Sequence, residues 1–156
     1  MNNDPFFEII EYRREYAQSS VEMWRASKYR ALGVVEAHSI EQHLYFLNEI
    51  LIKDHRVYLA LKRDSDQVIG LMATDGRTIN QLYIHIDCQG MGIGSALLQL
   101  AKEKSAGKLR LRTFEINRPA RQFYEKHGFR MIGQGNDNEE NLPDLLYQWA
   151  GDSVDP

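Results

Sequence analysis

Cysteine is scarce in this chain: Cys88 is the one cysteine among 156 residues. A single thiol cannot form an internal disulfide, so we expect a fold held together by its apolar core in a reducing compartment. Residues 1–5 also lack the basic start and the apolar stretch of a secretory signal peptide. Both absences favour a cytoplasmic location.

Long apolar runs and excess positive charge are missing as well. No run approaches the roughly 18 residues that a membrane-spanning helix needs. The net charge of −3 gives no general attraction to nucleic acid or to anionic membranes, so we expect neither as a partner. With 43% hydrophobic and 26% charged residues, the chain predicts one globular domain over residues 1–150 and a flexible tail over 151–156.

A glycine-rich segment is present, but two phosphate-binding signatures are absent from it. The segment reads Gln-Gly-Met-Gly-Ile-Gly-Ser over residues 89–95. A dinucleotide fingerprint would need glycine at its sixth position, where Ser95 stands, and the loop of nucleotide hydrolases would need Gly-Lys-Ser or Gly-Lys-Thr. The segment joins a β-rich run beginning at Leu82 to an apolar, helix-forming run. Its bare amides at a helix N-terminus suit an anion such as a pyrophosphate.

Apolar periodicity predicts a mixed α/β order of elements. Ser39 and Gln42 form a capping box before the second helix, and Asp75-Gly76 forms a tight turn between two strands. A helix links the strands over 78–86 and 109–114, so we expect these strands to be parallel neighbours. The predicted strands cover residues 6–13, 57–62, 68–74, 78–86, 109–114, 129–133 and 145–149, and the predicted helices cover 15–30, 40–51, 92–105 and 117–128.

These features together resemble a known family. Gln89, Gly92 and Gly94 satisfy the signature Gln/Arg-x-x-Gly-x-Gly/Ala of the GNAT superfamily of acyl-CoA-dependent N-acyltransferases, and residues 117–129 resemble its second motif. Both motifs occur in the expected order and spacing, and almost the whole chain follows the family's element order. The resemblance implies an α/β fold with a mixed, mostly antiparallel seven-stranded sheet and about four flanking helices. Its strands over 78–86 and 109–114 would be parallel and splayed.

The resemblance also implies an activity: transfer of an acetyl group from acetyl-CoA to a primary amine, by direct attack in a ternary complex. Backbone amides of the glycine-rich segment would hold the CoA pyrophosphate, and pantetheine would pair with the end of the preceding strand like an extra strand. No metal is implied. The residues implied to contact the cofactor are Leu82, Tyr83, Ile84, Gln89, Gly90, Met91, Gly92, Ile93, Gly94, Ser95, Asn117 and Tyr124.

Two residues receive catalytic roles from the resemblance. The amide of Ile84 would stabilise the oxyanion formed when the amine attacks the thioester. The phenol of Tyr124, with an ordinary pKa of about 10, would protonate the departing thiolate. Helical spacing also allows Tyr124 to be a core aromatic, and Asn117 can cap its helix while binding pantetheine.

A general base is what the sequence lacks most plainly. An amine with a pKa near 10 must lose a proton before it attacks, and family members often use a carboxylate on one of the two splayed strands. Here those positions hold Asn80, Gln81 and Arg112. A water relay or an amine that is already neutral would serve instead. The side chains that remain as candidates are Glu115, His85 and His127.

The acceptor is not identified by the residues. The acidic loop over 135–144 would attract a cationic amine or simply be solvated, and the surrounding sequence resembles bacterial GNAT members with no assigned substrate. The opposite wall is expected to hold Tyr29, Arg30, His38 and His43.

Three alternatives stay open at this stage. Cys88 beside the glycine-rich segment suggests a covalent acyl-cysteine route, although no partner base is evident. The domain could bind acyl-CoA without turnover, as a sensor or interaction module, or the loop could hold a different phosphate ligand. The resemblance also allows a homodimer.

Overall fold

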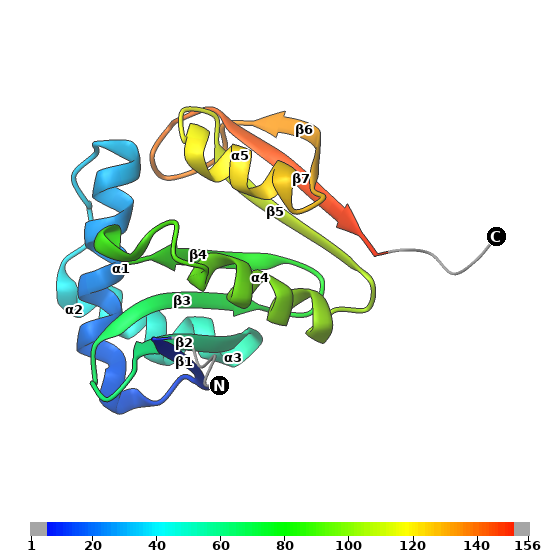
Figure 1. The fold of residues 1–156 in the computed structure, drawn as a ribbon. Helices are drawn as coiled ribbons and strands as arrows, with labels where there is room; N and C mark the ends of the chain where they lie inside the picture. Colours follow the sequence, from blue (N-terminus) through cyan, green and yellow to red (C-terminus); the bar gives the residue numbers. More distant parts are fainter. Residues whose placement is uncertain (1–5, 152–156) are drawn as a thin grey trace.

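The computed structural model describes residues 6–151, which form seven strands in two sheets with helices around them (Figure 1). The strands are β1 (Phe7–Glu11), β2 (Arg56–Lys62), β3 (Val68–Thr74), β4 (Ile79–Ile84), β5 (Lys108–Phe114), β6 (Arg130–Gly135) and β7 (Asp144–Ala150). The helical segments are η1 (Arg14–Tyr16), α1 (Ala17–Leu32), α2 (Ile40–Tyr45), η2 (Phe46–Leu51), α3 (Ile52–Asp54), η3 (Ile86–Cys88), α4 (Ile93–Lys104) and α5 (Arg118–Lys126).

The α/β fold class is confirmed, whereas the single seven-stranded sheet is wrong. The first sheet has the order β1-β2-β3-β4 and the second the order β5-β7-β6, and every pair within them is antiparallel. Parallel pairing of β4 with β5 is reduced to one bridge between Thr78 and Arg110. Beyond this bridge each strand follows its own antiparallel partner, and the twist of the two sheets carries the strands apart. The expected parallel arrangement of β4 and β5 is therefore limited to the bridge at which the two strands begin to diverge.

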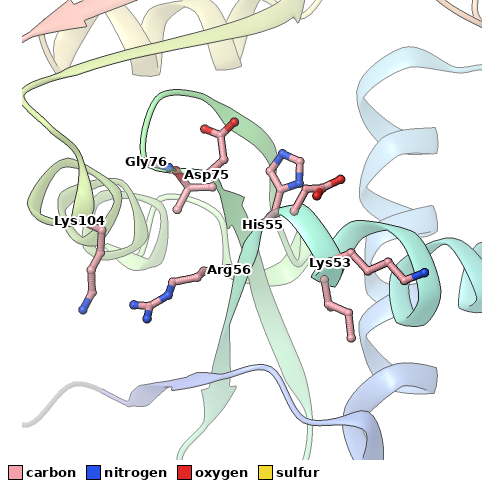
Figure 2. Close-up of a pocket in the computed structure, with 9 residues that line it drawn as sticks. Lys53, His55, Arg56, Asp75, Gly76 and Lys104 are labelled. Carbon is pink, nitrogen blue, oxygen red and sulfur yellow. Dashed lines mark hydrogen bonds between the residues drawn. The ribbon is translucent and has the colours of Figure 1, made fainter.

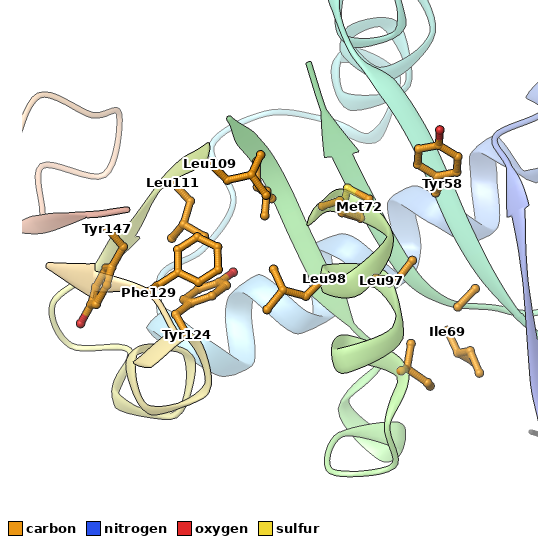
Figure 3. Packing of buried hydrophobic residues seen from close by; sticks show 14 of the residues in the cluster. Tyr58, Ile69, Met72, Leu97, Leu98, Leu109, Leu111, Tyr124, Phe129 and Tyr147 are labelled. Atoms are coloured by element: carbon orange, nitrogen blue, oxygen red, sulfur yellow. The ribbon is translucent and has the colours of Figure 1, made fainter. Parts of the chain in front are cut away.

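The four-stranded sheet is covered on both faces, which is why β2 and β3 are almost wholly buried. Helix α4 packs on one face through Ile93, Leu97 and Leu98. Figure 3 shows Leu97 and Leu98 in this position. The approach is close, because a Cβ on Gly70 of β3 would lie 2.9 Å from the Ile93 side chain. On the other face, α1 and η2 bury a second cluster that includes Trp24. Packed side chains therefore fill both faces of this sheet.

The second predicted helix begins as expected and then changes geometry. The capping box is confirmed, since the Gln42 amide donates to Ser39 Oγ at 3.1 Å and the Ser39 amide donates to Gln42 Oε1 at 2.8 Å. After α2, however, η2 is a π-helical turn, with hydrogen bonds from residue i to i+5. The apolar spacing predicts helix without separating these two forms, so the wide turn is a structural finding.

The first predicted helix, over 15–30, corresponds to η1 followed by α1 and extends to Leu32. Helix α1 ends at Gly33, which adopts a left-handed φ of 69°, and the expected tail after Gly151 lies outside the described residues. None of the helices within residues 6–151 has the length and apolar character needed to cross a membrane.

Candidate functional site

The glycine-rich segment forms a bare turn at the N-terminus of α4. Gly90 and Gly92 have φ angles of 79° and 93°, and no atom lies within 4 Å of a Cβ built on either. Gly92 is the N-cap, and no side chain accepts a hydrogen bond from the first turn there. The amides of that turn are consequently free of side-chain caps, and they carry the partial positive charge of a 12-residue helix.

The same segment is tied to its surroundings on two sides. Gln89 Nε2 donates to the Ile84 carbonyl at 3.3 Å, which fixes the loop to the end of β4. A Cβ on Gly94 would lie 3.2 Å from the ring of Phe123, so α4 and α5 approach closely at this point. Ser95 Oγ lies 3.2 Å from His127 Nε2 at the end of α5. The second sequence motif is thus brought against the first.

The end of β4 presents an open edge. The His85 amide donates to the Ile69 carbonyl of β3 at 2.9 Å. Because successive amides along a strand point to alternate edges, the amides of Ile84 and Leu82 point away from β3, whereas that of Tyr83 points toward it. The Ile84 carbonyl is occupied, since Ser27 Oγ donates to it at 2.7 Å. Two amides of β4 therefore face the space where β5 diverges.

Tyr124 lies on α5 with its ring buried among Phe123, Phe129 and Tyr147. Figure 3 shows the hydroxyls of Tyr124 and Tyr147 pointing away from each other. Burial, and then the nearby Tyr83 phenol, raise the pKa of Tyr124 above its ordinary value. Within residues 6–151 its hydroxyl has no hydrogen-bond partner, so its proton is free to be donated to a bound ligand. Tyr124 is therefore both a core aromatic residue and a residue with an unpaired hydroxyl.

Asn117 caps α5, as its sequence position suggests. Its Oδ1 accepts a hydrogen bond from the Ala120 amide at 3.3 Å.

A cleft of about 750 Å³ opens where β4 and β5 separate. One wall comes from α1, α2 and η2, and the other from β4, β5 and the loop between β6 and β7, which lies near α1 in Figure 1. His38 and His43 line this cleft as expected, whereas Tyr29 and Arg30 are exposed on α1 and do not. The other lining residues are Trp24, Lys28, Glu36, Gln42, Tyr45, Phe46, Ile50, Asn80, Gln81, Tyr83, Arg112, Thr113, Phe114, Asp137, Asn138, Glu139, Glu140 and Asp144.

Charges inside the cleft are organised around Lys28. Its ammonium lies 2.6 Å from the Glu140 carboxylate and 3.4 Å from that of Glu36. Burial by itself would lower the pKa of Lys28, but the bond to Glu140 and the surrounding charges raise it above its ordinary value. Burial would raise the pKa of Glu36, but Lys28 lowers it. One cation is therefore shared by two carboxylates, and the wall keeps an excess of negative charge.

Aromatic rings form the floor of the cleft. Trp24 stacks on Tyr83 with a centroid distance of 5.4 Å and meets His43 edge-on at 4.4 Å. Burial lowers the pKa of His43 to about 4, so this imidazole is neutral at pH 7. Its Nδ1 is buried and has no hydrogen-bond partner within the described part of the chain. The floor is thus uncharged beneath an acidic wall.

The candidates for a general base lie away from this cleft. Glu115 is exposed, His85 accepts a hydrogen bond from the Asp87 amide, and His127 contacts Ser95. Arg112 occupies a β5 position where family members often have a carboxylate, and here it donates a hydrogen bond to Asp144 at 2.8 Å. The carboxylates that do line the cleft include Glu36, which no sequence pattern singled out because it is distant in sequence from the acidic loop.

Cys88, the last residue of η3, is half-buried. Burial, and then the Asp87 carboxylate, raise the pKa of its thiol, which disfavours the thiolate needed for covalent catalysis. No cluster of three or more His, Cys, Asp or Glu side chains that could hold a metal ion occurs in residues 6–151.

A second hollow of about 430 Å³ lies at the opposite end of α4 (Figure 2). It is lined by His55, Arg56, Asp75 and Lys104 among others. Because α4 starts at the glycine turn and ends at Lys104, a helix about 18 Å long separates this hollow from the turn. It does not contribute to the cleft described above.

Comparisons with known proteins agree with this geometry. A family model described as acetyltransferase (GNAT) domain matches residues 53–131, just over half of the chain. The peptidyl-lysine N-acetyltransferase YjaB of Salmonella typhimurium is 28% identical over 140 residues, covering 86% of this chain and 91% of its own length.

Solved structures share the fold. The apo form of YjaB from Escherichia coli has a TM-score of 0.74 at 24% identity, covering 93% of this chain and 98% of its own. The PaiA N-acetyltransferase of Thermoplasma acidophilum, solved with coenzyme A, has a TM-score of 0.69 at 21% identity and covers 92% and 98%. With the family model matched across the bare turn and the open strand edge, the chain belongs to the GNAT family of acetyltransferases, which transfer an acetyl group from acetyl-CoA.

Proposed function

We propose that this acetyltransferase modifies the side-chain amine of lysine in a polypeptide, by direct attack of the amine on acetyl-CoA in a ternary complex. The observation that carries this proposal is the acidic cleft between β4 and β5, which adjoins the open edge of β4. An ammonium group would be attracted by the excess carboxylates there. The name of the Salmonella relative, a peptidyl-lysine N-acetyltransferase, supports the same acceptor.

The bare turn would hold the donor. Amides of residues 90–95 would bind the CoA pyrophosphate at the N-terminus of α4, where the helix dipole favours an anion. Pantetheine would then lie along the open edge of β4 and pair with the amides of Leu82 and Ile84. Asn117, at the start of α5, would contact it from the other side. This placement directs the thioester toward the cleft.

The chemical step needs an acceptor for negative charge and a source of a proton. As the amine attacks the thioester carbonyl, the outward-facing amide of Ile84 would stabilise the oxyanion. When the carbon–sulfur bond breaks, the Tyr124 hydroxyl would protonate the thiolate of CoA. A raised pKa keeps this phenol protonated at neutral pH, so the proton is available at each turnover.

The amine must lose a proton before it attacks, and the acidic wall supplies the groups for this. Glu36 and Glu140 already hold an ammonium, that of Lys28. We propose that carboxylates of this wall bind the acceptor ammonium and receive its proton through water. Glu115, His85 and His127 do not line the cleft and have no such position.

A direct test incubates the protein and acetyl-CoA with a panel of amines that includes a lysine peptide blocked at its N-terminus. Released CoA and the mass of the peptide are measured together. The proposal requires one acetyl group on the lysine for each CoA released. If acetyl-CoA raises the melting temperature but no amine in the panel releases CoA, the chain is an acyl-CoA sensor instead. Stabilisation by NAD or ATP alone would identify a different phosphate ligand.

A further inference from the structure

Three apolar side chains line the outer part of the acceptor cleft: Tyr45, Phe46 and Ile50, here called the apolar rim. Tyr45 is 62% exposed and Ile50 is 46% exposed. By contrast, the side chains of Lys28, Glu36 and Glu140 in the same cleft are only 15–17% exposed. The exposed part of the cleft therefore has an apolar side, formed by the rim, in addition to charged side chains such as Glu139, which is 72% exposed.

The π turn is what places the rim on one face. In an α-helix, residues five apart point about 140° away from each other. In η2 the hydrogen bonds run from residue i to i+5, which widens the turn and brings residues five apart to nearly the same face. Tyr45, the last residue of α2 and the N-cap of η2, and Ile50 have this spacing. The irregular turn thus presents two large apolar side chains to the cleft that a regular helix would separate.

The buried carboxylates and the exposed apolar rim together restrict the acceptor. A linear polyamine that placed one ammonium beside the carboxylates would have no apolar side chain to bury against the rim. A lysine in a polypeptide meets both surfaces, because its ammonium lies beside the carboxylates while a neighbouring residue remains at the rim. Burying an apolar neighbour there is favourable in proportion to the area removed from water.

We infer that the apolar rim selects lysines that have an apolar residue directly beside them in the polypeptide. The inference rests on the proposed lysine acetylation and adds the sequence context of the acceptor. Tyr45 and Ile50 act as specificity residues: they contact the neighbour of the reacting lysine and not the lysine itself.

The test compares two N-terminally blocked heptapeptides with one central lysine, flanked on both sides by leucine in the first and by serine in the second. The wild-type protein is expected to acetylate the leucine peptide with a kcat/KM at least about fivefold higher. Ile50→Ser and Tyr45→Ala should reduce this ratio toward one, mainly by raising KM for the leucine peptide. The chain offers matched controls, Ile52→Ser and Tyr29→Ala, at side chains 40% and 58% exposed that do not line the cleft.

The outcomes separate the inference from the proposed function. Equal kcat/KM for both peptides would overturn the inference that the apolar rim selects the peptide, and so would an equal loss of discrimination in the control variants. Either result would leave the proposed lysine acetylation in place. Acetylation of spermidine in strong preference to both peptides would overturn the proposed lysine acetylation, and the inference about the rim with it. Failure to acetylate any amine, with acetyl-CoA still bound, would overturn the proposed function itself.

Discussion

The Lys28 ammonium lies 2.6 Å from the Glu140 carboxylate, and this contact fastens α1 to the loop between β6 and β7 across the acceptor cleft. A parallel contact joins His38 and Glu139, whose Nε2 and Oε2 atoms are 2.9 Å apart. Within residues 6–151, one β-bridge, at Thr78, pairs the two sheets, and a shared apolar cluster packs between them. The side-chain charges add a further link across the acceptor cleft.

Replacing Lys28 with methionine should destabilise the fold by about 1–3 kcal/mol, because two half-buried carboxylates lose their shared cation. Thermal or urea unfolding at pH 7 measures this. Arg14→Met is the matched control, since Arg14 pairs with Glu49 on the surface and exposed pairs contribute little. A loss of stability no larger than that of the control would contradict the role given to Lys28.

Tyr124→Phe should lower kcat by a factor of about 10²–10⁴ with a much smaller change in the affinity for acetyl-CoA, since general acid catalysis is lost while the buried ring remains. Steady-state kinetics and calorimetric titration measure the two quantities. Tyr147→Phe is the control for removing a hydroxyl from the same aromatic group, because that hydroxyl donates to Glu125 instead. Equal losses in turnover and in affinity would remove the general-acid assignment.

Gly92→Ala should weaken acetyl-CoA binding at least about tenfold, because a left-handed φ costs alanine about 1–2 kcal/mol and the turn would shift to relieve it. Gly33→Ala is a matched control, as Gly33 also has a positive φ and open space around it but ends α1 far along the chain from the turn. Both variants should lose stability, and only Gly92→Ala should lose affinity. Loss of affinity in both would point to a general effect on folding.

Acid should weaken the fold through His43. Its pKa is lowered from 6.5 to about 4 in the folded chain, so its contribution to stability is fully present above pH 6.5 and is lost as the pH falls toward 4. The loss amounts to up to about 3 kcal/mol. His43→Phe should flatten the dependence of urea unfolding on pH between 7 and 4. An unchanged slope would mean that another group governs this range.

Cys88→Ala should retain full activity, because direct attack does not use the thiol. A loss of turnover, with an acetyl group found on Cys88 of the wild-type protein by mass spectrometry after brief exposure to acetyl-CoA, would restore the covalent route.

Local signals in the sequence predicted the parts of the molecule that local chemistry determines. The capping box at Ser39, the cap at Asn117 and the bare turn at Gly92 all depend on residues within a few positions of one another, and the structure has all three. The α/β class followed from the order of the elements in the same way. The contacts proposed for acetyl-CoA remain predictions, because they concern a ligand that the fold alone does not contain.

The acceptor side was predicted only in part: His38, His43 and the acidic loop over 135–144 were expected there and line the cleft, whereas two other features were missed for physical reasons. Its acidic wall joins Glu36 to Glu140, residues about a hundred positions apart with no shared periodicity, so tertiary folding alone brings them together. The π turn has the apolar pattern of an α-helix, so Tyr45 and Ile50 gave no sign of sharing a face. The division of the sheet was missed as well, since β5 pairs along its length with β7 instead of β4.

The edge of β4 that faces β5, joined to it by the one bridge at Thr78, has a consequence for the behaviour of the protein in concentrated solution. Exposed amides on a strand edge are a template onto which the strand of another molecule can add, and this is how many β-proteins aggregate. A donor molecule lying along that edge covers the template. Bound acetyl-CoA would then slow aggregation of the protein as well as supply the acetyl group. The protein without acetyl-CoA would precipitate first.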